Sequence, residues 1–156
     1  MDRNTRPLPA NVREDLRLYY GGRIRPTKMW RAQKQAEAED LAAGRIDPAN
    51  AFCERLFPDT FLDAVDELLN TYDADIAALG TSPNDYPRVM ACIERAVVGL
   101  HDLETRLGKS YIDTDERELL CAYLDNVIIQ HGIDIRALAA WQGCGEYELA
   151  DVYGGI

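Results

Sequence analysis

The sequence predicts an all-α protein, a single-domain antiparallel bundle of about six to eight helices, three of them long. No segment alternates apolar and polar residues over the length of a strand, whereas three long segments repeat apolar residues at helical spacing. The connections between these segments are short, which favours antiparallel neighbours. A chain of 156 residues is long enough to bury one core without disulfides or metal.

The best-specified helix covers residues 113–132. Asp113 or Thr114 can cap its first turn, and Gly132 can end it in a left-handed conformation. Its apolar face is wide, so several neighbouring elements must cover it. Ile129 projects instead from the polar side, where either another element or a partner has to cover it.

Two further long helices are predicted over residues 59–79, before Gly80, and residues 86–107, before Gly108. Each has one continuous apolar stripe. Because the face of the 113–132 helix is broad enough to meet both stripes, we expect that helix to lie between the other two.

Shorter helical elements are expected over residues 12–20, 27–43, 48–57 and 134–142, with one more turn in the tail. The 27–43 helix is predicted from its strong helix formers, because Met29 and Trp30 are its only large apolar residues before Leu41. We expect it to pack loosely, mainly through those two side chains.

Charge divides the chain unevenly. Residues 1–35 carry nine Lys or Arg against three acids, a net charge of +6, whereas the remainder carries eight against twenty-four, a net charge of −16. We therefore expect a basic N-terminal arm with loosely packed helices over residues 1–46, and an acidic helical bundle over residues 47–156, within one domain overall. Such an asymmetry bears on the partners of a protein.

No targeting segment and no membrane-length apolar run is visible, and the four cysteines form no CxxC pair. We therefore expect a cytoplasmic protein with reduced thiols and no contact with a membrane.

The polar side of the 59–79 helix carries a ridge of carboxylates, Asp63, Asp66, Glu67 and Asp73, with no basic residue inside the helix to neutralise them. Such a ridge is typical of a solubilising face. A helix face that carries only negative charge can also bind a cationic partner.

Two ionisable residues interrupt the apolar stripe of the 86–107 helix. Glu104 lies on the apolar side and His101 at its border, three residues apart, so that the two could form a proton-transfer or metal-binding pair. Two ligands are fewer than a metal site uses, and packed residues are the commoner outcome. Since no catalytic motif is present either, we expect no metal, no cofactor and no catalytic residues, and the sequence favours a protein that is not an enzyme.

The basic stretch GGRIRPTKMW brings together Arg23, Arg25, Lys28 and Arg31 with one aromatic residue, Trp30. On an acidic protein this is more typical of a solvated surface or an internal ion-pairing strip than of a nucleic-acid site. Nucleic acid is therefore a disfavoured partner.

Three segments, FPDTFLDAVDELL, HDLETRL and LDNVIIQHGIDI, resemble a family of small, acidic, all-helical bacterial proteins of uncharacterised function. The resemblance covers about residues 57–140. Proteins of this kind are often encoded as protective partners of secreted bacterial toxins, so the resemblance implies an immunity-type binding protein and supplies no catalytic residues.

The leading hypothesis is a non-enzymatic protein-binding module, an immunity-type inhibitor that meets a basic toxin through its acidic ridge and Ile129. One alternative is a small helical enzyme or metal-dependent protein that uses His101 and Glu104. A second alternative is a regulatory module whose basic N-terminus contacts DNA.

Overall fold

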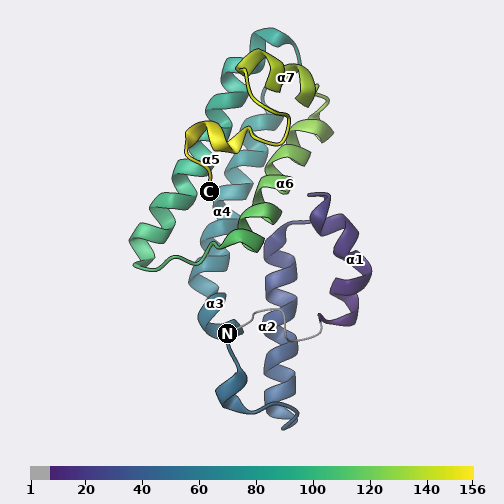
Figure 1. Ribbon diagram of the computed structural model, residues 1–156, viewed down its shortest axis with the longest axis vertical. Coiled ribbons are helices and arrows are strands. Elements are labelled where there is room, and N and C mark those ends of the chain that lie inside the picture. Colours follow the sequence, from purple (N-terminus) through teal and green to yellow (C-terminus); the bar gives the residue numbers. More distant parts are fainter. Residues whose placement is uncertain (1–7) are drawn as a thin grey trace.

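The computed structural model describes residues 8–156, and every secondary-structure element in this range is helical, as the sequence predicts (Figure 1). The α-helices are α1 (Ala10–Tyr20), α2 (Pro26–Ala42), α3 (Cys53–Leu56), α4 (Asp59–Ala77), α5 (Tyr86–Leu107), α6 (Thr114–His131) and α7 (Ile135–Gln142). Three 3-10 turns are η1 (Pro48–Asn50), η2 (Pro83–Asp85) and η3 (Ala150–Tyr153). The expected arm at residues 1–7 lies outside the described residues.

The three predicted long helices are confirmed as α4, α5 and α6, and their ends follow local chemistry. Asp113 precedes α6 and accepts a hydrogen bond from the backbone N–H of Thr114 at 2.9 Å, while Gly132 ends the helix with φ of 99°. Asp134 caps α7 by accepting from the backbone N–H groups of Arg136 and Ala137, each at 3.1 Å.

The arrangement of the long helices differs from the expected one, because α4 lies between α5 and α6, and α6 does not lie between α4 and α5. The most extensive helix pair is α4 with α5, and α4 also packs on α2 and α6 (Figure 1). Helix α6 packs mainly on α4, α1, α2 and α7. Gly99 of α5 explains the close α4–α5 pair, because a Cβ at this position would meet the side chain of Leu68 on α4 at 2.6 Å.

Helix α2 is anchored more firmly than its composition suggests. Trp30 is only 1% exposed, and its ring stacks on Phe57 at a centroid distance of 5.4 Å and on Phe61 at 6.2 Å. Large aromatic side chains bury much apolar area, so one tryptophan joins α2 to the start of α4.

The link between α1 and α2 crosses α6 at very short range. Gly22 has φ of 74°, and a Cβ added there would overlap the backbone carbonyl group of Ala122 on α6. Backbone atoms cannot move aside as a flexible side chain can, so this crossing requires glycine.

Among the described residues, no helix is long and apolar enough to cross a membrane.

We expect Gly22→Ala to lower the free energy of unfolding by more than about 3 kcal/mol, because it adds a backbone clash to the ordinary cost of a positive φ. Gly44→Ala is the matched control, since Gly44 has φ of 69° but open space around it. The control should cost only about 1–2 kcal/mol. Urea unfolding followed by circular dichroism measures both values, and equal losses would contradict the close crossing.

Candidate functional site

The acidic ridge of α4 is covered by cations from the chain's own N-terminal region. Arg25, at the start of α2, donates from Nη2 to Asp73 Oδ2 at 2.8 Å and from Nε to the hydroxyl oxygen of Tyr123 at 3.1 Å. Its Nη1 lies 3.6 Å from Asp66 Oδ1. The Tyr123 hydroxyl in turn donates to Asp73 Oδ2 at 2.7 Å. One guanidinium therefore joins α2, α4 and α6.

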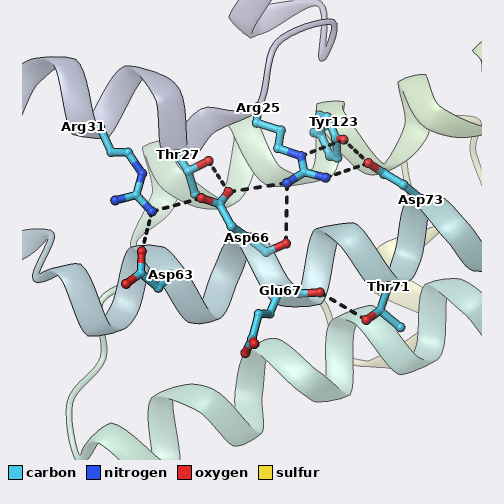
Figure 2. A network of polar contacts seen from close by, with 9 residues as sticks. All are labelled: Arg25, Thr27, Arg31, Asp63, Asp66, Glu67, Thr71, Asp73 and Tyr123. Carbon is cyan, nitrogen blue, oxygen red and sulfur yellow. Dashed lines mark hydrogen bonds and ion pairs between the residues drawn. The ribbon is translucent and has the colours of Figure 1, made fainter.

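Two further side chains extend these contacts along α4. Arg31 Nη2 lies 3.0 Å from Asp66 Oδ2 and 2.8 Å from Asp63 Oδ1. The Thr27 hydroxyl donates to Asp66 Oδ1 at 2.6 Å. Figure 2 shows these contacts as one continuous system. We call it the Arg25 network, and its members are Arg25, Thr27, Arg31, Asp63, Asp66, Asp73 and Tyr123.

The network is partly withdrawn from water. The side chains of Arg25, Asp66 and Asp73 are 25%, 28% and 35% exposed. Burial by itself lowers the pKa of the Arg25 guanidinium, but its hydrogen bonds to Tyr123 and Asp73 outweigh this and raise the pKa above its usual value. Burial, together with the hydrogen bond to Asp73, raises the pKa of the Tyr123 phenol. The arginine therefore stays charged, and the phenol keeps the proton that it donates.

Asp63, Asp66 and Asp73 have cationic partners within the chain, supplied by residues outside α4. The helix itself contains no basic residue, and its partners come from a distant segment, since Arg25 and Asp73 are 48 residues apart. Of the four ridge acids, Glu67 is the one that no cation reaches among residues 8–156.

Glu67 lies on the rim of a groove between α4 and α5 with a volume of about 650 Å³. The same groove is lined by Asp102, Arg95 and Arg106, so its rim carries both signs of charge. A mixed rim of this kind gives no preference for a basic partner over an acidic one.

The basic strip of the N-terminal region is an internal ion-pairing strip in the case of Arg25 and Arg31. Lys34 behaves similarly, since its Nζ lies 2.8 Å from Asp59 Oδ1. Arg23 and Lys28 point to solvent. Two of the four predicted cations are therefore engaged with carboxylates and are not free to meet a phosphate backbone.

His101 and Glu104 are not brought together as a functional pair. His101 Nε2 lies 2.6 Å from the carbonyl oxygen of Gly155, near the C-terminus. Glu104 Oε2 accepts a hydrogen bond from the backbone N–H of Ile112 at 3.2 Å. Each side chain thus fastens a different loop to α5. Residues 8–156 contain no group of three His, Cys, Asp or Glu side chains that could hold a metal ion.

Ile129, predicted as an isolated apolar residue, is 46% exposed at the C-terminal part of α6. Two aromatic residues that were not predicted as site residues accompany it in the following segment, Trp141 at 51% exposure and Tyr147 at 77%. We call Ile129, Trp141 and Tyr147 the α7-end residues, because α7 and the segments next to it carry them (Figure 1).

The backbone around these residues is held in place. Trp141 meets Tyr86 edge to face with ring centroids 5.9 Å apart. Arg136 Nε donates to Glu146 Oε2 at 2.9 Å, which ties the loop of Tyr147 back to α7. The exposed side chains therefore project from a backbone whose position these contacts fix.

Asp125 of α6 has the most unusual carboxyl group near this end of the molecule. Burial, reinforced by the negative charge of Asp151 in η3, raises its pKa from the usual value to about 7. Burial also raises the pKa of the nearby Cys121 thiol to about 11. The thiol therefore stays protonated at neutral pH and is a poor nucleophile.

Comparison of the chain with protein-family models, with curated proteins and with solved structures gives no match. The resemblance to immunity-type proteins therefore rests on the quoted sequence segments alone.

We expect Arg25→Met to lower the free energy of unfolding by about 1–3 kcal/mol, because Asp73 loses its cation and its other oxygen, Oδ1, is buried without a hydrogen-bond partner in the described part of the chain. In a double-mutant cycle, adding Asp73→Asn should recover part of this loss. Arg45→Met, which removes a solvent-exposed ion pair with Asp40, should cost less than about 1 kcal/mol. Urea unfolding measures all three, and losses of equal size at Arg25 and Arg45 would contradict a structural role for the network.

The raised pKa of Asp125 predicts a pH-dependent stability. The pKa of Asp125 is about 4 in the unfolded chain and about 7 in the folded protein, so the folded protein binds more protons than the unfolded chain between these pH values. The free energy of unfolding therefore falls as pH rises through this window. Asp125→Asn should therefore be more stable than the wild type at alkaline pH, by about 1–3 kcal/mol, and the difference should vanish at acidic pH. Asp102→Asn removes an exposed carboxylate from α5 and serves as the control. Urea unfolding at several pH values measures the difference, and a pH-independent gain would exclude titration as its cause.

Proposed function

We propose that this protein is a non-enzymatic binding module for a basic protein partner, of the immunity type, in which one antiparallel helical bundle presents the α7-end residues. The observation that carries the proposal is the exposure of Ile129, Trp141 and Tyr147. The four free cysteines are compatible with the cytoplasmic location that belongs to the same proposal.

The α7-end residues have the chemistry of an interface centre. Tryptophan and tyrosine are enriched among the residues that dominate binding energy, because they bury large areas at a low cost in side-chain entropy. Here the frame beneath them is held by the Trp141–Tyr86 contact and the Arg136–Glu146 ion pair. Exposed aromatic side chains on a supported backbone suit a protein partner better than they suit solvent.

The charge around these residues favours a basic partner. Residues 125–151 carry five carboxylates and one arginine. Glu146 pairs with Arg136, whereas burial and the repulsion from the negative charge of Asp151 raise the pKa of Asp125. A cationic partner would relieve this repulsion and would be steered by it during encounter.

The ridge acids Asp63, Asp66 and Asp73 have a different role in this proposal. They hold α2 to α4 through the Arg25 network, and a partner that competed for them would have to break pairs as short as 2.8 Å. We therefore place the proposed partner surface at the α7 end and not on the α4 ridge. Ile129 belongs both to this surface and to the one predicted from the sequence.

The Trp141→Ala and Tyr147→Ala double variant should lose binding to the basic partner by at least about tenfold, which corresponds to about 1.4 kcal/mol. The partner is sought by affinity capture from the source organism at low salt, and its binding should weaken steeply as salt is added. Tyr20→Ala is the matched control, since Tyr20 is 56% exposed on α1. Capture of the same protein by the double variant and the control alike would exclude the α7 end as the site.

A further inference from the structure

A cavity of about 280 Å³ lies between α1, α2, α3 and the first turn of α6. Its lining is dominated by large apolar side chains, including Met29, Trp30, Phe52, Phe57 and Leu119. Well-packed cores leave few voids of more than one water molecule. A void of this size with largely apolar walls and a few polar groups, among them Gln33, is a candidate binding site for a small molecule.

We propose that this cavity binds a small uncharged aromatic molecule of one or two rings. Trp30 and Phe57 both line it, and their rings are nearly parallel, with an interplanar angle of 5°. Phe61 also stacks on Trp30, and this contact fixes the position of the tryptophan ring. Trp30 itself is only 1% exposed, so an aromatic ligand would meet this set of rings chiefly through the sides of Phe52 and Phe57 that line the cavity.

The size of the cavity limits the ligand. A cavity of about 150 Å³ with apolar walls is enough to bind benzene in another protein. The larger volume here therefore accommodates one substituted ring or a fused pair, and excludes a nucleotide or a peptide.

The polar groups of the wall decide the charge of the ligand. Glu37 is only 3% exposed, and its carboxylate oxygens accept hydrogen bonds from the backbone N–H groups of Phe52 at 3.1 Å and Cys53 at 2.9 Å. Glu116 is buried to the same degree and also has its own interactions. Asp115, the third carboxylate of the lining, lies at an exposed position, and no described lining residue is Lys, Arg or His. The wall offers an anionic ligand no counter-charge and offers an uncharged ring an apolar surface.

The test uses a built-in reporter. The chain has two tryptophans, so Trp141→Phe leaves Trp30, at the cavity wall, as the only one. The probe is 4-bromobenzyl alcohol, whose bromine quenches tryptophan fluorescence at contact. We expect saturable quenching of Trp30 and a rise in the melting temperature that depends on probe concentration. The anion of similar shape, 4-bromobenzoate, should give neither.

Filling the cavity should abolish the effect. Ala36 of α2 lines the cavity, whereas Ala38 on the same helix is exposed. Ala36→Phe should weaken probe binding at least tenfold, and Ala38→Phe should leave it unchanged. If Ala36→Phe does not fold, the smaller Ala36→Leu replaces it. Quenching that does not saturate, quenching by 4-bromobenzoate at the same concentrations, or unchanged binding in a folded Ala36 variant would each overturn the proposal.

Discussion

The Arg25 guanidinium is the interaction on which the arrangement of the helices depends most. It stands at the first turn of α2 and reaches Asp73 on α4 and Tyr123 on α6, residues that are 48 and 98 positions away in the sequence. Charge-assisted hydrogen bonds are stronger and more directional than neutral ones. The basic N-terminal region and the acidic body are therefore joined at a defined register, and Trp30 adds the apolar part of the same joint.

This joint separates the carboxylates of the protein into two groups. Those of the α4 ridge face the chain's own cations, with Glu67 as the exception, and they act as structural residues. Those near α7, with Asp125 and Asp151 close to each other, have fewer cations beside them. The net negative charge of a protein indicates its partners only if the acids that pair within the chain are not counted. In this protein the acids of the α4 ridge other than Glu67 are paired, so the proposed partner surface lies at the α7 end.

Polar residues that interrupt apolar helix faces serve in this protein to fasten loops. His101 holds the C-terminal segment through Gly155, and Glu104 holds the segment before α6 through Ile112. His131 does the same for the end of α4, with its Nε2 2.7 Å from the carbonyl oxygen of Leu79. Buried backbone groups outside helices need partners, and these side chains supply them.

The sequence by itself determined the all-helical class, the positions of α4, α5 and α6, and the caps at Asp113 and Asp134. All of these follow from apolar spacing and hydrogen bonds within a few residues, which a single segment contains. It also suggested an internal ion-pairing strip, and it placed Ile129 on the polar side of its helix. Only the tertiary structure decided which acids meet Arg25, that His101 and Glu104 separate, and that Trp141 stays exposed. The reason is that these outcomes depend on how distant helices cross, and helical periodicity carries no information about that crossing.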